Sequence, residues 1–187
     1  MNMFTTTGKI TDHFKGVEFK CKCGCGQINI DTMFVERMED LHTVLSSLPC
    51  GCTGIYINSG YRCAKHSQTI QGAFIGDMHN IGAAADFHAL DKNKKLIDSM
   101  ILCEAAQRCG FGGIAIIDST NAHVDDRQRG DIVYSNKQWY GNEATGQNVT
   151  TFKGKSKYTN DIWKKKNQKY IEIMIDDHRY SGLLEEI

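Results

Sequence analysis

The chain has 187 residues, enough for one domain with a sizeable hydrophobic core. Its 22 basic residues balance its 22 acidic residues, and no basic tract with interleaved aromatics occurs, which argues against nucleic acid as a partner. No run of eighteen apolar residues that would span a membrane is present, and the polar start lacks the apolar stretch of a signal peptide. We therefore expect a protein made in the cytoplasm without a signal peptide or transmembrane segment.

The first half of the chain predicts a lead-in, a helix and two strands. Residues 1–30 form an irregular lead-in, and a helix follows from Asp31, whose carboxylate is a plausible N-cap. The helix is indicated by apolar residues at helical spacing, namely Phe34, Met38, Leu41 and Leu45. The elements expected next are a strand over 54–58, a short helix over 63–70, a loop over 72–82 and a buried strand over 83–89.

The second half predicts a long helix over 92–108, ended by Gly110, and then further strands. These strands are expected over 113–117, 122–126 and 131–135, followed by a polar loop or linker over about 136–160 and a closing hairpin near 170–177. We therefore expect a main domain over 1–135 and a C-terminal extension over 136–187 that packs on the same domain. The fold class is α+β, with a small, mostly antiparallel sheet and helices packed to one side.

Two short segments carry the residues most suited to chemistry. His79 and Asp86 are separated by glycine and small residues, so they can converge across a tight turn into a strand. His123 and Asp125 point to one face of a predicted strand, because side chains alternate along strands. Two histidines and one carboxylate leave a fourth position open, as a catalytic zinc site requires. A single histidine is more often an ordinary surface residue, and His13 is read in that way, as are His42 and His178.

Three motifs in order give the chain a resemblance to a known family. They are Ser-Gly-Tyr-Arg at 59–62, the segment Asp-x-His-x-x-Gly-x-Ala-x-Asp at 77–86, and His-Val-Asp at 123–125. Over about residues 11–130 the sequence resembles the zinc D-Ala-D-Ala carboxypeptidase and peptidoglycan endopeptidase family, whose fold is shared with the hedgehog signalling domain. The preceding Phe-x-Cys-x-Cys-Gly-Cys at 19–25 resembles the phage and prophage branch of that family.

The resemblance implies a role for each matched residue. His79, Asp86 and His123 would hold one catalytic zinc ion. Arg62 would bind a carboxylate of the substrate through two parallel hydrogen bonds, and Ser59 would help to orient that substrate. The substrate class that the resemblance implies is the peptide stem of bacterial peptidoglycan, as for an endolysin that reaches the cell wall after the membrane is opened.

The identity of the general base is where the sequence departs from its relatives. Several carboxypeptidases of the group place an acidic base three residues before the last histidine, and this chain has Thr120 there. Asp125 is the first candidate to replace it, since it shares a strand face with His123 and would act as a catalytic base. Asp118 and His88 are the other candidates. Each also has a structural interpretation, which for Asp125 is support of a metal ligand. Asp77 stands where many members have serine, so hydrogen bonding in that loop is expected to differ.

Eight cysteines are many for this length, and their count alone does not fix their state. Two groups close in sequence predict a second, structural zinc site; their members are Cys21, Cys23, Cys25, Cys50 and Cys52. The Cys-x-Cys spacing is shorter than the usual Cys-x-x-Cys of zinc knuckles, so this signal is weak. Cys103 and Cys109 are most simply small core residues.

The sequence thus predicts a zinc metallopeptidase, a carboxypeptidase or endopeptidase that hydrolyses an amide bond in the peptidoglycan stem. The alternative is a non-catalytic, zinc-stabilised module that binds the cell wall or belongs to a virion. Which bond is cleaved, the role of residues 136–187 and the oligomeric state are left open by the sequence.

Overall fold

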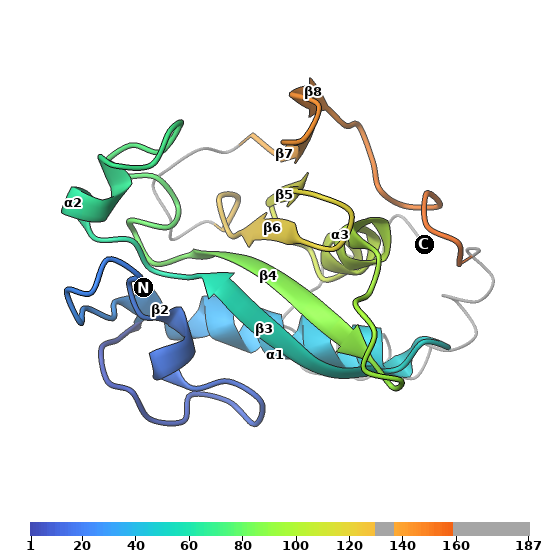
Figure 1. Ribbon diagram of the computed structural model, residues 1–187, viewed down its shortest axis with the longest axis horizontal. Coiled ribbons are helices and arrows are strands. Elements are labelled where there is room, and N and C mark those ends of the chain that lie inside the picture. The colour runs from blue at the N-terminus through green and yellow to red at the C-terminus, as the bar shows by residue number, and fades with distance from the viewer. Residues whose placement is uncertain (130–136, 159–187) are drawn as a thin grey trace.

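The computed structural model describes residues 1–129 and 137–158, which are built around one six-stranded sheet (Figure 1). The strand order is β3-β4-β6-β5-β7-β8, and all neighbours pair antiparallel except β5 and β7, which are parallel. The strands are β3 (Cys52–Ser59), β4 (Ala84–Asp91), β5 (Gly113–Ile116), β6 (Ala122–Asp125), β7 (Trp139–Asn142) and β8 (Gln147–Asn148). The predicted α+β class with a mostly antiparallel sheet is confirmed.

Two helices, α1 (Thr32–Ser47) and α3 (Ser99–Arg108), pack on one face of the sheet and on each other (Figure 1). Asp31 caps α1 as expected, because its carboxylate accepts a hydrogen bond from the Met33 amide at 3.1 Å. The core between the helices and the sheet takes alternate residues of the central strands, such as Phe87 of β4 and Val124 of β6. The intervening residues of β4 and β6 therefore lie on the opposite face of the sheet, away from the helices.

The lead-in packs against the start of the loop that follows β3. It contains a small two-stranded sheet of β1 (Met3–Phe4) and β2 (Ile30–Asp31), and a 3₁₀ turn, η1 (Gly16–Phe19). The Tyr61 amide donates to the Phe19 carbonyl at 2.9 Å. A Cβ atom at Gly60 would lie 2.6 Å from the Phe19 Cα, so the close approach of these two backbones requires glycine. The short helix α2 (Ala64–Ser67) follows.

Two sequence-based expectations were wrong in the second half. The helix expected over 92–108 begins only at Ser99, because the Asp98 carboxylate caps it by accepting from the Met100 amide at 2.8 Å. Residues before Asp98 instead turn back along β4, where the Ile97 amide donates to the Ala89 carbonyl at 2.9 Å. The segment 136–160 is not simply a loop or linker, since β7 and β8 extend the sheet.

The segment 136–160 differs from the expectation because of contacts with distant parts of the chain. The backbone of β7 pairs with the free edge of β5, and Tyr140 and Phe152 are buried in the main core. The strand expected over 131–135 and the hairpin near 170–177 lie outside the described residues, as does most of the C-terminal extension. The division at residue 135 stays a prediction.

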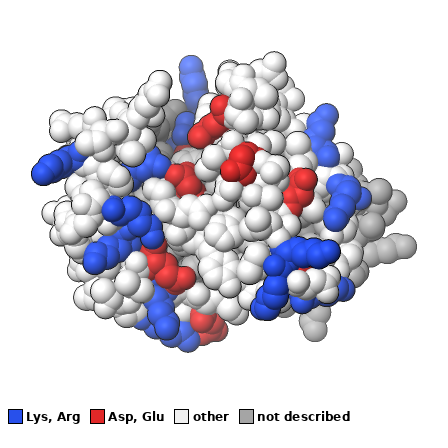
Figure 2. Space-filling model, viewed as in Figure 1, with Lys and Arg blue, Asp and Glu red and all other residues white. Residues whose placement is uncertain are grey.

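No helix of the described residues is long and apolar enough to cross a membrane. In Figure 2, several acidic side chains lie in the upper middle of the face shown, while lysines and arginines lie mainly around its edge. That face therefore shows no continuous basic patch.

Candidate metal centre

The open face of the sheet brings His79, Asp86 and His123 together. Asp86 of β4 and His123 of β6 are direct partners in the antiparallel register, and His79 reaches them from the loop before β4. The Asp86 Oδ1 lies 2.8 Å from His123 Nδ1 and 3.3 Å from His79 Nε2, and the two nitrogens are 3.3 Å apart. Nitrogen and oxygen ligands about 2.0–2.1 Å from a tetrahedral zinc ion are about 3.3 Å from one another. The three donor atoms thus have the spacing that zinc needs.

Hydrogen bonds on the far sides of both rings orient the donor atoms. His79 Nδ1 lies 2.7 Å from the Gly60 carbonyl oxygen, and His123 Nε2 lies 3.1 Å from Asp125 Oδ2. Both partners are acceptors, so these ring nitrogens carry hydrogens, and in the neutral rings the lone pairs of His79 Nε2 and His123 Nδ1 face Asp86. Such outer hydrogen bonds are usual for metal-binding histidines. The residues present therefore fit a zinc ion in donor type, spacing and orientation.

Asp125 is fully buried behind His123 and is held by further hydrogen bonds from Arg127. The Arg127 amide and Nε each donate to its Oδ1 at 2.9 Å, and Arg127 Nη2 donates to its Oδ2 at 2.6 Å. A Cβ atom at Gly113 of β5 would lie 2.1 Å from Asp125 Oδ2, so the carboxylate occupies the space that this glycine leaves. Burial by itself would raise the pKa of Asp125, but the hydrogen bonds from His123 and Arg127 lower it to about 2.

The same opposition of burial and hydrogen bonding acts on the other two groups. Burial by itself would raise the pKa of Asp86, but the adjacent His79 and His123 hold that pKa well below its usual range. Burial would lower the pKa of His123, but hydrogen bonds to Asp125 and Asp86 raise it to about 10. Without a metal ion the ring is therefore protonated at neutral pH, and a zinc ion would bind by displacing the proton on Nδ1. Asp86 is therefore ionised at neutral pH, which is the state that binds a cation.

Arg62 lies beside the second oxygen of Asp86. Its Nη2 donates to Asp86 Oδ2 at 2.7 Å, and its Nε donates to the Ser59 hydroxyl at 3.1 Å. Ser59 is not among the residues that line the adjacent cavity, and its hydrogen bond to Arg62 indicates that it orients that side chain. Arg62 does line the cavity, and neither of these two contacts uses its Nη1.

Asp77, the departure from serine, closes the loop that carries His79. Its carboxylate accepts from the Asn80 amide at 2.7 Å, and the Asn80 side chain donates to the Arg62 carbonyl at 2.8 Å. The Arg62 amide in turn donates to the His79 carbonyl at 3.2 Å. The loop thus fixes His79 and Arg62 relative to each other.

A cavity of about 330 Å³ opens over the three donor atoms. Its lining includes residues of the 70–79 loop and three residues that the sequence did not single out, namely Arg127, Trp139 and Glu143. Arg127 stacks over the Trp139 ring at 4.8 Å. Trp139 and Glu143 come from the segment expected to be a linker, and only the pairing of β7 with β5 brings them here. For Arg127, the alternation with Asp125 was a usable signal.

The two other candidates for the base lie outside this cavity lining. Asp118 accepts hydrogen bonds from the amides of Thr120 and Asn121, both at 2.8 Å, so it is a turn residue. His88 shares the strand face of Asp86, but it bonds to Asn58 at 2.9 Å and stacks on Tyr56.

The five cysteines that were expected to form a second zinc site do not all lie together. Among the described residues, Cys21, Cys23 and Cys25 lie close to Cys63, not to Cys50 and Cys52. The sequence signal that was missed is the position of Cys63, directly after the Ser-Gly-Tyr-Arg motif.

Comparison with known proteins gives one match. A sequence model of the family described as Peptidase M15 matches residues 12–125, a span that contains all three donor residues. No curated protein and no solved structure shows a significant match to the chain.

Proposed function

The chain belongs to the peptidase M15 family, and on that premise we propose that it is a zinc peptidase that hydrolyses an amide bond in the peptide stem of bacterial peptidoglycan. The observation that carries the proposal is the triangle of His79 Nε2, Asp86 Oδ1 and His123 Nδ1, with sides of 2.8–3.3 Å, at the floor of an open cavity. Zinc bound by such a site supplies Lewis acidity, which polarises a carbonyl and makes water more acidic.

We assign the proton-accepting role to Glu143 in place of Asp125. A carboxylate whose pKa is lowered to about 2 is a poor acceptor at neutral pH, and both oxygens of Asp125 are already bonded to His123 and Arg127. Glu143 is exposed, lines the same cavity, and makes no side-chain hydrogen bond or ion pair with the described residues. Its carboxylate is thus available to take a proton from water and pass it to the leaving amine.

Arg62 would bind a carboxylate of the substrate. Its Nε and one hydrogen of Nη2 are used by Ser59 and Asp86, but the edge formed by its two terminal nitrogens remains for a second carboxylate. Stem peptides are rich in carboxylates, which supports this substrate class. Asp125 would then hold the ring of His123 in the orientation that binds metal.

The assignment of the base is tested by two matched substitutions on a stem-peptide substrate. Glu143→Gln should keep its zinc and lose about two to four orders of magnitude in kcat, the range for removing general acid–base help. Glu36→Gln, at an exposed position on α1, should leave kcat unchanged. Full activity of Glu143→Gln would return Asp125 to first place among the candidates.

The activity itself is tested on purified peptidoglycan. The protein should release new amino termini, the release should stop with a chelator, and zinc should restore it. Mass spectrometry of the muropeptide products then identifies the bond. No release from any peptidoglycan by the zinc-loaded protein would favour the non-catalytic cell-wall or virion module.

We further propose that the protein acts as a phage or prophage lysis protein. This step rests on the resemblance of residues 19–25 to that branch of the family and on the cell-wall substrate. Expression inside a bacterium should lyse cells only when a pore-forming protein is expressed with it, and lysis by the protein alone would argue against this route.

A further inference from the structure

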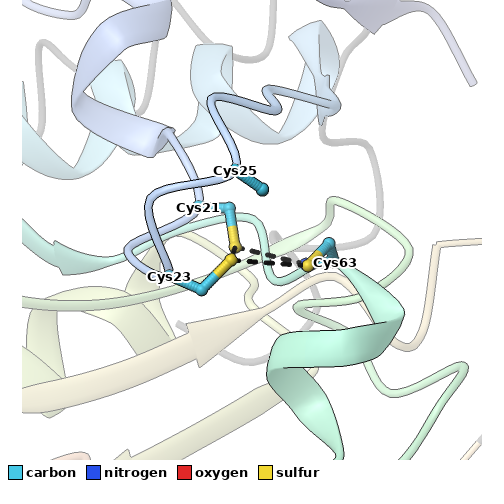
Figure 3. Close-up of side chains that lie close together, drawn as sticks. All are labelled: Cys21, Cys23, Cys25 and Cys63. Carbon is cyan, nitrogen blue, oxygen red and sulfur yellow. Dashed lines mark hydrogen bonds between the residues drawn. The ribbon is translucent and has the colours of Figure 1, made fainter.

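A second cluster of metal-binding side chains lies where the lead-in meets the loop after β3 (Figure 3). The sulfur of Cys23 is 3.4 Å from that of Cys21 and 3.6 Å from that of Cys63. All three are free cysteines. Two thiolates bound at about 2.3 Å to a tetrahedral zinc ion are about 3.8 Å apart. The three sulfurs therefore have nearly the spacing of zinc ligands.

Backbone groups in the cluster point at the sulfurs. The Cys63 amide donates to the Cys21 sulfur and the His66 amide donates to the Cys63 sulfur, both at 3.4 Å. Hydrogen bonds of this kind hold the Cys21 and Cys63 side chains in place, as the outer hydrogen bonds of metal ligands do. Both cysteines are also buried, so a metal ion bound between them would be shielded from solvent.

The lead-in is shaped to present its cysteines together. The Cys21 amide donates to the Gln27 carbonyl at 2.9 Å, which closes a loop around Cys23. Gly24 and Gly26 in this loop have φ angles of 84° and 78°, a backbone conformation that residues other than glycine rarely adopt. The two glycines therefore allow the chain to turn back tightly after Cys23, although the cysteines are separated by only one residue.

Two side chains at the edge of the cluster can supply a fourth donor. His66 Nδ1 lies 3.3 Å from the Cys21 sulfur, close to the separation of about 3.6 Å expected for nitrogen and sulfur ligands of one zinc ion. The Cys25 sulfur lies within 4.8 Å of the other sulfurs but is 3.7 Å from the Gln27 side-chain oxygen, to which it donates.

We propose that Cys21, Cys23 and Cys63 bind a second, structural zinc ion, with Cys25, whose sulfur lies within 4.8 Å of all three, or His66, which is near Cys21, as the fourth ligand. Four protein ligands leave no open position, and none of these side chains lines the cavity over His79. Such a closed, sulfur-rich site stabilises a fold and does not catalyse. It would join the lead-in to the residue after Arg62, and so hold Arg62 and the Gly60 carbonyl that orients His79.

The unmodified, zinc-loaded protein gives the first test. A mercurial reagent that reacts with thiols should release one zinc ion per chain, because the site of His79, Asp86 and His123 contains no sulfur. The zinc that remains should belong to that site, and peptidase activity is not needed for the measurement. Release of no zinc by the mercurial, or a cross-link between Cys21, Cys23 and Cys63 found by mass spectrometry without reductant, would overturn the proposal.

Variants and cobalt give the second test, which separates this proposal from the proposed function. In His123→Ala, cobalt should still bind and show the charge-transfer absorption of thiolate ligands. That absorption should be lost in His123→Ala/Cys63→Ser and kept in His123→Ala/Cys50→Ser, a matched change at a half-buried cysteine outside the cluster. Loss of a ligand signal in His66→Ala or in Cys25→Ser identifies the fourth ligand, and either supports the site. Cobalt binding without thiolate absorption in His123→Ala would overturn it, whatever the activity of the wild type.

Discussion

The two clusters of metal-binding side chains differ in the secondary structure that carries them as much as in the type of donor atom. The first stands on adjacent strands, where register sets Asp86 opposite His123, and each ring is held from behind by an acceptor. The second stands on a glycine-containing loop and a four-residue helix, held by amides that donate to sulfur. The first faces the cavity described above, and no side chain of the second lines that cavity. Paired strands with an open side suit catalysis, whereas a closed set of protein ligands on a loop would stabilise that part of the fold.

The comparison predicts that loss of a ligand has its largest effect at the first cluster. His123→Ala should reduce peptidase activity to background, because two donors cannot hold a catalytic metal ion. His88→Ala, on the same face of the sheet but bonded to Asn58, should keep zinc and activity. Zinc content and stem-peptide kinetics are the measurements. Equal activity of the two variants would remove His123 from the site.

The outer hydrogen bond of the first cluster should matter less than its ligands. Asp125→Asn keeps the size of the side chain but removes the charge that faces His123 and Arg127. We expect zinc affinity to fall about 10- to 100-fold, as for other partners of metal-binding histidines. Zinc affinity is measured by competition with a chelator. If affinity is unchanged while kcat collapses at saturating zinc, Asp125 is the base and the assignment of Glu143 is wrong.

Arg62 joins the two clusters, since it bonds to Asp86 and directly precedes Cys63. Arg62→Lys should keep zinc but lose about 2 kcal/mol, roughly 30-fold in kcat/KM, because lysine cannot form the paired hydrogen bonds. The deficit should shrink on a substrate whose carboxylate is amidated. A deficit of the same size on both substrates would mean that Arg62 acts on Asp86 alone.

Thiol reactivity gives the smallest but most direct contrast. Burial raises the pKa of the Cys103 and Cys109 thiols far above their usual range, so both should resist labelling in the folded protein. The exposed Cys23 should be protected only while zinc is bound. Removal of zinc should therefore add the cluster thiols to the fast-reacting set and leave Cys103 and Cys109 unreactive. Equal labelling of Cys23 with and without zinc would contradict the structural site.

Local pattern was enough for the features that depend on neighbours in sequence. The cap at Asp31, the core-facing periodicity of α1 and the alternation along β4 and β6 follow from helix and strand geometry. His79 and Asp86 could be paired because a short turn joins them, and His123 because the family motifs occur in order. The shared strand face of His123 and Asp125 was also predicted, and it is correct.

What the sequence left undecided depended on pairing between distant segments. Only the register of β4 with β6 places Asp86 opposite His123, and only the parallel pairing of β7 with β5 brings Glu143 to the cavity. Cys63 meets Cys21 and Cys23 for the same kind of reason, since the lead-in packs on the loop after β3. Proximity in sequence favoured Cys50 and Cys52, but a metal site is selected by distance in space, and that distance is set by the packing of the whole chain.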